Sequence, residues 1–291
     1  MGLIETDETN LFTFESFAAH EFYTDVNRAL VKQTLAHLRT QEGDKPLTIV
    51  DMACGTGAVT RLIAEELVRQ GHSAQLRLVG VDPSAEALRL AQKGMDELHL
   101  PANITSDFIQ GESEDLPNLV HDVDAAFFCN AIHLVPDKVA AFKQVSAILA
   151  PQGIFGCNSA FYDGTYVPGT ERFYRLWTRR AVGWLKKEHP EAHLSREAKA
   201  MAMQWLNPDQ YIQALKENGF TTVETQSTNI EISLDGWRDL GQYWLFIEGA
   251  LPGVPLADGA RALEIAVYQA GEELGLNAIP RTWLQMVAIK Q

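Results

Sequence analysis

The segment Val50–Val59, VDMACGTGAV, joins an apolar run to a turn in which two glycines bracket a threonine. Glycine weakens the interior of strands and of helices, so Gly55 and Gly57 mark a connection between elements. The residues before them, 47–52, are apolar and rich in branched side chains, which predicts a buried strand. Residues 58–70 repeat apolar side chains at helical spacing. A strand that enters a helix through glycines lets a ligand approach the backbone, although tight packing is an alternative explanation.

The same alternation of strand and helix continues along the chain. Further strands are predicted at 76–81, 108–110, 124–128 and 153–159, and helices after Ser84 and at 138–149. Strands buried on both faces that alternate with helices predict an α/β fold, with a doubly wound, Rossmann-like and mostly parallel sheet. Ligands of such folds bind beyond the carboxyl ends of the strands.

The remaining segments surround this core. Residues 12–40 have a helical pattern, and Asn207-Pro208 starts a helix that Gly219 ends. The pattern predicts strands at 221–232 and 282–289 and helices at 237–251 and 260–274, which makes a seven-stranded sheet. We expect a single domain over 1–291, with N-terminal helices at 1–43, a core at 44–160, a helical cap insertion at 161–206 and a C-terminal part at 207–291.

The charge of the chain limits its partners. The 291 residues carry a formal net charge of -14, which disfavours nucleic acid and anionic membranes. The densest basic run, 172–187, is interleaved with aromatic residues. This run is either a binding surface for an anion or RNA, or the solvated basic face of an amphipathic helix. The negative net charge of the chain favours the amphipathic helix.

Cysteine and histidine give little sign of a metal or a disulfide framework. The three cysteines, Cys54, Cys129 and Cys157, are widely spaced and are expected to be buried thiols, with a thiol-binding substrate as the alternative. His189 and His193 lack a third ligand, so no metal is expected. The N-terminus shows neither a signal peptide nor a membrane span. We expect a cytoplasmic monomer or homodimer that acts on a small molecule.

Polar residues follow each of the first four strands of the predicted sheet. Asp82-Pro83 follows the second strand, where an acid can accept both hydroxyls of a ribose. Glu112-Ser113 follows the third, and this pair suits the amino group and a ring nitrogen of adenine. The fourth is followed by Asn130 and His133. Each feature alone has an ordinary structural explanation, such as helix capping by the acid or a polar loop.

Together, these segments resemble the class I S-adenosylmethionine-dependent methyltransferases, over residues 45–160. The resemblance implies S-adenosyl-L-methionine as cofactor and S-adenosyl-L-homocysteine as product, and an antiparallel last strand. It implies that the glycine turn meets the methionine part of the cofactor and that the acid after the second strand holds the ribose. It also implies that an N-terminal aromatic residue closes over the methionine end. The residues that match are Tyr23, Asp51, Ala53, Gly55, Gly57, Asp82, Pro83, Glu112, Ser113, Cys129 and Asn130. Many family members have glycine at the place of Ala53 and aspartate at the place of Glu112.

The chemistry then depends on the methyl acceptor. A phenol or an alcohol needs a base, an amine only has to be neutral, and a carbon needs an electron-rich centre. His133 is the best candidate for a base, although histidines in such turns often make structural hydrogen bonds. An oxidoreductase that uses NAD would share the glycine turn and Asp82, but it leaves Glu112-Ser113 unexplained. A non-catalytic protein that binds S-adenosylmethionine is the other alternative.

Aromatic residues in the predicted inserts supply a substrate pocket. So many aromatic side chains over the cofactor cleft fit a capped and largely apolar pocket, although most of them are ordinary core residues. We therefore predict a methyltransferase that transfers a methyl group to an O, N or C atom of a small apolar or aromatic metabolite, of the kind found in secondary metabolism. The candidates for substrate contact are Tyr162, Tyr174, Trp177, Trp205 and Trp244.

Overall fold

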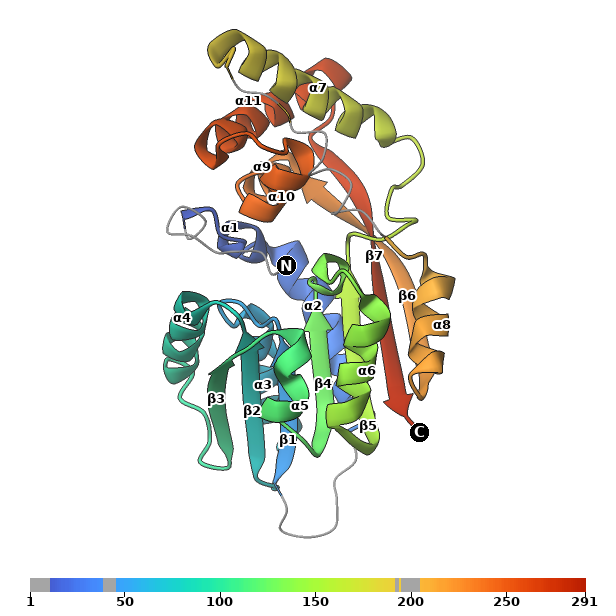
Figure 1. The fold of residues 1–291 in the computed structure, drawn as a ribbon. Coiled ribbons are helices and arrows are strands. Elements are labelled where there is room, and N and C mark those ends of the chain that lie inside the picture. The colour runs from blue at the N-terminus through green and yellow to red at the C-terminus, as the bar shows by residue number, and fades with distance from the viewer. Residues whose placement is uncertain (1–10, 39–45, 192–193, 195–204) are drawn as a thin grey trace. The chain divides into compact units, whose positions relative to one another are not determined.

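The computed structural model describes residues 11–38, 46–191, 194 and 205–291 (Figure 1). The chain divides into two compact units, each of which is described here by itself. The sheet unit comprises Thr24–Asp163, Trp205–Thr228 and Trp283–Gln291. The helical unit comprises Met1–Tyr23, Gly164–Gln204 and Asn229–Thr282.

The sheet has seven strands in the order β3-β2-β1-β4-β5-β7-β6. β1 to β5 are parallel neighbours, and β7 runs antiparallel to β5, with Ile154 opposite Ile289 and Ser159 opposite Leu284. The prediction of a mostly parallel, doubly wound sheet with an antiparallel last strand is confirmed. The strands are β1 Leu47–Met52, β2 Leu76–Asp82, β3 Ile104–Gln110, β4 Val123–Cys129, β5 Leu149–Ser159, β6 Phe220–Ser233 and β7 Ala278–Lys290.

Helices cover both faces of the sheet, as the apolar pattern of its strands requires (Figure 1). In β1, Val50 and Met52 pack in one core cluster with residues of α5, α6 and α8, while Ile49 packs in a second cluster with residues of α2, α3 and α4. Alternate residues of a strand point to opposite faces, so β1 is buried from both sides. The helices are α2 Glu21–Leu35, α3 Ala58–Gln70, α4 Ala85–Asp96, α5 Leu116–Leu119, α6 Lys138–Ile148 and α8 Pro208–Glu217, with the short 3-10 helices η2 Ser113–Asp115 and η3 Ile132–Leu134.

The helical unit is built around the contact between its two long helices. These are α7 Glu171–Glu188 and α11 Leu256–Leu274, and the shorter helices are α1 Glu15–Ala18, α9 Leu234–Leu240 and α10 Trp244–Ala250. The indole N–H of Trp177 in α7 donates to the carbonyl of Leu263 in α11 at 2.8 Å. Trp237 of α9 is wholly buried and lies 5.9 Å from Trp177, ring centroid to ring centroid. Large aromatic side chains therefore form most of this core.

Several predicted element boundaries were wrong. The N-terminal helices predicted from the pattern at 12–40 are α1 and α2, and residues 39–40 lie outside the described residues. The helix predicted at 237–251 is broken into α9 and α10 at residues 241–243, where Gly241 follows α9 and is a poor helix former. Within 161–206, the described helix is α7 alone, because Gly164 and Gly169 take positive φ angles of 115° and 95° in the preceding loop; residues 192–193 and 195–204 lie outside the described residues.

The third strand is longer than its apolar residues predicted. β3 begins at Ile104, whereas the apolar run begins at Phe108. β3 is the edge strand of the sheet, and its Thr105 and Asp107 are exposed. Polar residues in an edge strand remove the apolar pattern from which a strand is predicted. They also protect the edge against pairing with other chains.

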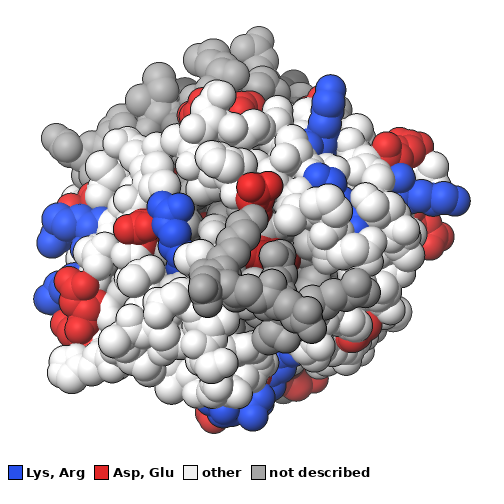
Figure 2. All heavy atoms as spheres, turned by 90° about the horizontal axis from the view of Figure 1, so that it is seen from below, with Lys and Arg blue, Asp and Glu red and all other residues white. Residues whose placement is uncertain are grey.

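Charges of both signs are distributed over the surface. Figure 2 shows one face on which Lys and Arg side chains lie next to Asp and Glu side chains, without a segregated basic area. Paired charges of this kind include Arg28 with Glu65 at 2.9 Å and Arg77 with Asp107 at 2.7 Å. Among the described helices, none is both long enough and apolar enough to cross a membrane.

Candidate functional site

The glycine turn after β1 serves two different purposes. Gly55 and Gly57 both take positive φ angles, of 53° and 79°. A Cβ added to Gly57 would lie 3.0 Å from the Cβ of Ala91 in α4, so this glycine permits helix packing. A Cβ added to Gly55 would meet nothing within 4 Å, so packing does not explain this glycine. The open space beside the Gly55 backbone is what close approach of a ligand requires.

Two other residues in left-handed conformations follow the ends of β1 and β4. Ala53 has a φ of 51° and Asn130 a φ of 54°, and neither is a glycine. Such a backbone costs about 1–2 kcal/mol for a residue with a side chain. Non-glycine residues in this region cluster at active sites and ligand clamps. His99, Asp122 and Gln152 share this conformation elsewhere in the chain, so the backbone of Ala53 and Asn130 supports a candidate site here only together with the polar groups beside it.

Asp82 connects the ends of β1 and β2. Its Oδ2 accepts the backbone N–H of Gly55 at 2.8 Å, and its Oδ1 accepts the backbone N–H of Ser84 at 3.0 Å. The hydroxyl of Ser84 accepts the N–H of Ala87 and so caps α4. Ser84 therefore caps the helix, and the carboxylate of Asp82, which is 8% exposed, is held by backbone donors in a fixed orientation.

Asp51 at the end of β1 is a buried carboxyl group. It is 2% exposed, and the hydroxyl of Thr60 donates to its Oδ2 at 2.6 Å. The pKa of Asp51 is raised to about 7, above all by burial; the hydrogen bond from Thr60 opposes this rise, and the nearby charge of Asp82 adds to it. A carboxyl group with this pKa can change its charge near neutral pH in response to a bound cation.

The Glu112-Ser113 pair lies next to Asp82. The N–H of Gly111 donates to the backbone carbonyl of Asp82 at 3.1 Å, and the side chain of Gln110 donates to the carbonyl of Pro83 at 2.8 Å. The N–H of Glu112 donates to Asp115 Oδ2 at 3.1 Å at the start of η2. The hydroxyl of Ser113 donates to Glu114 at 2.9 Å. The carboxylate of Glu112 itself is exposed to solvent.

A buried network of amides holds Asn130 at the end of β4. The indole N–H of Trp283 donates to Asn130 Oδ1 at 2.9 Å, and Asn130 Nδ2 donates to Asn27 Oδ1 at 3.1 Å. Asn158 donates to the same Asn27 oxygen at 2.9 Å and accepts the backbone N–H of Asn130 at 3.0 Å. Asn27 and Asn158 are 0% and 1% exposed. These bonds fix the side chain of Asn130 and also offset the cost of its left-handed backbone.

The cysteines of this region are buried thiols, as expected. Cys129 lies at the end of β4, and burial raises the pKa of its thiol well above the ordinary value. Cys54 and Cys157 are also buried and free. Within the described residues, no group of three or more His, Cys, Asp or Glu could hold a metal ion; His193 lies outside those residues.

His133 in η3 lies against the end of β5. Its Nδ1 is 3.1 Å from the hydroxyl oxygen of Ser159, and its ring stacks on Phe161 with centroids 4.5 Å apart. Phe161 in turn contacts Trp205 edge to face at 6.1 Å. His133 and Trp205 are both half-buried. The sheet unit therefore places a histidine and two aromatic rings side by side.

The other aromatic candidates lie in different surroundings. Tyr162 belongs to the sheet unit and is buried in its core. Tyr23, Tyr174, Trp177 and Trp244 belong to the helical unit. Within that unit, Tyr23 is buried against Phe14 and Phe17, and Trp177 stacks on Phe246. Tyr174 and Trp244 are half-buried.

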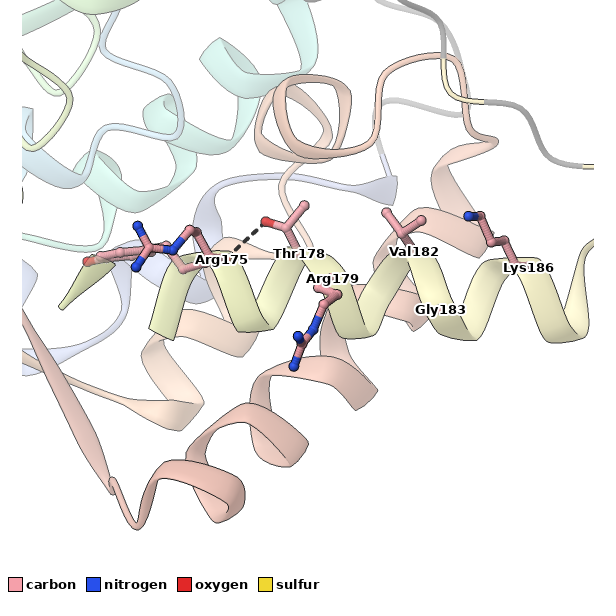
Figure 3. A pocket seen from close by; sticks show the side chains of 7 residues that line it. Arg175, Thr178, Arg179, Val182, Gly183 and Lys186 are labelled. Atoms are coloured by element: carbon pink, nitrogen blue, oxygen red, sulfur yellow. Dashed lines mark hydrogen bonds between the residues drawn. The ribbon is translucent and has the colours of Figure 1, made fainter. Parts of the chain in front are cut away.

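The basic side chains of the run 172–187 lie on the exposed face of α7, so this helix is amphipathic, as the sequence indicated. Its buried residues are Phe173, Leu176, Trp177, Ala181 and Leu185. A surface hollow of about 660 Å³ lies along the other side of this helix. Thr178, Val182 and Lys186 point in one direction at intervals of four residues (Figure 3). The hollow is lined by Tyr174, Arg175, Thr178, Arg179, Val182, Gly183 and Lys186.

Several residues that hold the candidate site were missed by sequence reasoning. They are Asn27, Thr60, Asn158, Ser159 and Trp283. Asn158 offered a signal, since it is an amide inside the apolar run of β5. Asn27 offered a weaker one, since it lies on the apolar stripe of α2. Buried polar residues of this kind need partners, and their presence in an apolar run indicates a network.

The comparison with known proteins agrees with the topology and the glycine turn. Residues 49–153 match the family described as "Methyltransferase domain". This segment is therefore similar to a methyltransferase domain over about a third of the chain. The segment holds the glycine turn, Asp82, Glu112-Ser113, Asn130 and His133.

The similar proteins and solved structures are distant from this chain in sequence. A ubiquinone/menaquinone biosynthesis C-methyltransferase of Rhizobium meliloti is 29% identical over 140 residues, which is 48% of this chain and 51% of that protein. A demethylmenaquinone methyltransferase of Thermotoga maritima is 23% identical over 60% of this chain and 70% of its own. The YcgJ protein of Bacillus subtilis has a TM-score of 0.55 at 16% identity, over 92% of this chain and 99% of that one. The match thus spans about half the length of the Rhizobium relative, and the YcgJ likeness supports the fold alone.

Proposed function

We propose that this chain is a methyltransferase that uses S-adenosyl-L-methionine and methylates a small, largely apolar or aromatic molecule. The observation that carries the proposal is the edge of the sheet at which β3, β2, β1 and β4 end side by side. Each of these strands is followed by the residue type that one part of the cofactor requires, and the Gly55 backbone next to them is open.

The residues present fit the cofactor in chemistry. Backbone donors hold the carboxylate of Asp82 at the end of β2, and an acid at this place in a doubly wound sheet suits the hydroxyls of a ribose. Asp51 is a buried carboxyl group that gains from a nearby cation, and the methionine part of the cofactor carries an ammonium and a sulfonium. The exposed carboxylate of Glu112 is available to an adenine amino group. Gly57, Ala53, Pro83, Cys129 and Asn130 would shape the backbone around these groups, with the Ser113 N–H near the adenine ring. Tyr23 belongs to the helical unit, and its contact with the methionine end stays a prediction from the resemblance.

When bound, S-adenosylmethionine supplies an activated methyl group, so the protein mainly has to position the acceptor and exclude water. His133 is the proposed base. Its imidazole would accept the proton of a hydroxyl or of an acidic carbon while the acceptor attacks the methyl group. A proton acceptor of this kind contributes about 10²–10⁴-fold to the rate.

The rings around His133 support an aromatic acceptor. Phe161 stacks on the histidine, and Trp205 meets Phe161 at its edge. We assign Trp205 and Tyr162 of the sheet unit to substrate contact. Tyr174, Trp177 and Trp244 belong to the helical unit, and for them substrate contact stays a prediction from the sequence. The Rhizobium relative is a ubiquinone/menaquinone biosynthesis C-methyltransferase and the Thermotoga relative is a demethylmenaquinone methyltransferase, and these activities fit an aromatic acceptor.

A transfer assay with methyl-labelled S-adenosylmethionine tests this proposal. Quinols and phenols form one panel of acceptors, and primary amines form a second panel. We expect label in a product of the first panel and a loss of most of that label with His133→Asn. Label in amines alone, with His133→Asn fully active, would contradict both the acceptor class and the role of the base.

A further inference from the structure

We propose that Ser159 is a positioning residue that keeps the proton of neutral His133 on Nδ1, so that Nε2 carries the lone pair of the ring. The tautomer follows from hydrogen bonds within the sheet unit. Its catalytic meaning rests on the proposed function, in which His133 is the base.

The hydroxyl of Ser159 has three close polar neighbours. Its Oγ accepts the backbone N–H of Phe161 at 2.9 Å and donates to the carbonyl of Phe161 at 3.2 Å. His133 Nδ1 lies 3.1 Å from the same oxygen. Ser159 is 2% exposed, so its hydroxyl is held by these protein groups.

A hydroxyl group has one proton to donate and two lone pairs with which to accept. If that proton goes to the carbonyl of Phe161, the contact with His133 can be a hydrogen bond only when Nδ1 is the donor. All three contacts are then satisfied together. In the other tautomer, Nδ1 is an acceptor, and it competes with the carbonyl of Phe161 for the single proton of Ser159. The Nδ1–H tautomer is therefore the one that the geometry selects.

The surroundings hold the histidine ring in the plane that this bond needs. His133 lies in η3, directly after the end of β4, and Ser159 is the last residue of β5. The two strands are paired up to Cys129 and Asn158, so both residues leave the sheet at the same level. Phe161 binds Ser159 through its backbone and stacks on His133 through its ring, with an interplanar angle of 29°. One loop thus sets both the tautomer and the orientation of the ring.

This arrangement suits a proton acceptor. The O–H or acidic C–H bond of the acceptor breaks, and its electron pair stays on the oxygen or carbon that attacks the methyl group. The proton joins the lone pair of Nε2, and His133 becomes an imidazolium with a proton on each nitrogen. The Nδ1–H bond to Ser159 is unchanged in this step, so the site does not have to rearrange. Preorganisation of this kind avoids a reorganisation cost during the reaction.

Nitrogen-15 NMR of the full chain labelled in its histidines tests the proposal without any substrate. The protein has eight histidines, and the resonances of His133 are identified by their loss in His133→Asn. At a pH at which the imidazole of His133 is neutral, we expect Nδ1 to show the chemical shift of a protonated nitrogen and Nε2 that of an unprotonated nitrogen. Ser159→Ala should move the ring toward the opposite tautomer, and Ser159→Thr, which keeps the hydroxyl, should restore the wild-type pattern.

Thr178→Ala is the matched control, because it removes a hydroxyl from the exposed side of α7 in the other unit and should leave the spectrum unchanged. A wild-type spectrum with the proton on Nε2 would overturn the proposal even if Ser159→Ala did not fold. An identical tautomer in Ser159→Ala would also overturn it. Since the spectrum needs no methyl acceptor, a failure of the proposed function would show in the transfer assay and would leave this result intact.

Discussion

The carboxylate of Asp82, at the end of β2, accepts the backbone N–H of Gly55 at 2.8 Å in the turn that follows β1. One residue thus orients the glycine turn and presents an acid beside it. The Asp82 carboxylate also accepts the N–H of Ser84, so its position is fixed from both sides. The glycine turn and Asp82, which are separate motifs in the sequence, are thus joined by hydrogen bonds in the structure.

Asp82→Ala should weaken binding of S-adenosylhomocysteine by about 100-fold, because each lost hydrogen bond to a charged group is worth about 1.5–3 kcal/mol. Isothermal titration calorimetry measures the change. Asp107→Ala is the control, since it removes an exposed aspartate of β3 that pairs with Arg77. Equal affinities for wild type and Asp82→Ala would refute the assignment of Asp82 to the ribose.

Asp51 should make cofactor binding depend on pH. Its pKa of about 7 means that the carboxyl group is largely protonated at pH 5 in the free protein. A bound ammonium favours the ionised form, so affinity for S-adenosylhomocysteine should rise from pH 5 toward pH 7, by at most tenfold per pH unit. Titrations near pH 6 in buffers of different ionisation enthalpy should show a proton released on binding. Asp51→Asn should remove this release, and a release that persists in the variant would exclude Asp51 as its source.

Asp51 should also make the stability of the fold depend on pH, but stability should fall as the pH rises, whereas cofactor affinity should increase. Its folded pKa of about 7 exceeds the 3.8 of an unperturbed aspartate, so the folded state binds more protons between these values. The contribution of Asp51 to stability is complete below pH 4 and is lost as the pH rises through 7. Urea unfolding of wild type and Asp51→Asn over this range should show a difference in stability that changes with pH. A constant difference from pH 4 to pH 7 would contradict the raised pKa.

The two glycines of the turn should respond differently to alanine. Both substitutions place a side chain on a left-handed backbone, at a cost of about 1–2 kcal/mol. Gly57→Ala adds a contact of 3.0 Å with Ala91, so it should lower the free energy of unfolding more than Gly55→Ala does. Gly55→Ala should instead weaken cofactor binding more, since its Cβ would occupy the open space. Gly183→Ala on α7 is the control and should stabilise the chain by about 1 kcal/mol. A larger stability loss at Gly55 than at Gly57 would contradict these roles.

The amide network should be a major source of local stability. Asn27→Ala removes the oxygen that accepts from both Asn130 and Asn158, and each buried donor left unsatisfied costs about 1–3 kcal/mol. Urea denaturation should therefore show a loss of several kcal/mol, against almost none for Asn118→Ala at an exposed position of α5. Equal stability of these two variants would mean that the network does not hold Asn130.

Much of the fold could be predicted because local patterns decide it. The apolar run of β1, the glycines after it and the stripe of α3 gave both elements with the bounds that the structure has. The break between α9 and α10 was missed, because three residues at 241–243 interrupt an apolar pattern that continues on both sides. Single glycines do not always end a helix, so that pattern was ambiguous.

The candidate site was predictable only in part. Asp51, Gly55 and Asp82 stand out because each is a polar or glycine residue at the end of an apolar strand or shortly after it. The partners of Asn130 could not be found in this way, since Asn27 lies 103 residues before it and Trp283 lies 153 residues after it. The positive φ of Ala53 was equally hidden, because alanine carries no signal for a left-handed backbone. Contacts of this kind are determined by the tertiary fold rather than by the local sequence.

The central claim is that the edge of the sheet around Gly55 and Asp82 binds S-adenosylmethionine. Calorimetric titration of the full chain with S-adenosylmethionine, S-adenosylhomocysteine and NADH tests it most directly. We predict binding of both sulfur compounds at micromolar concentration, with no binding of NADH. Binding of NADH alone would indicate an oxidoreductase, and the absence of binding by either sulfur compound would contradict the account and leave the glycine turn as a packing feature.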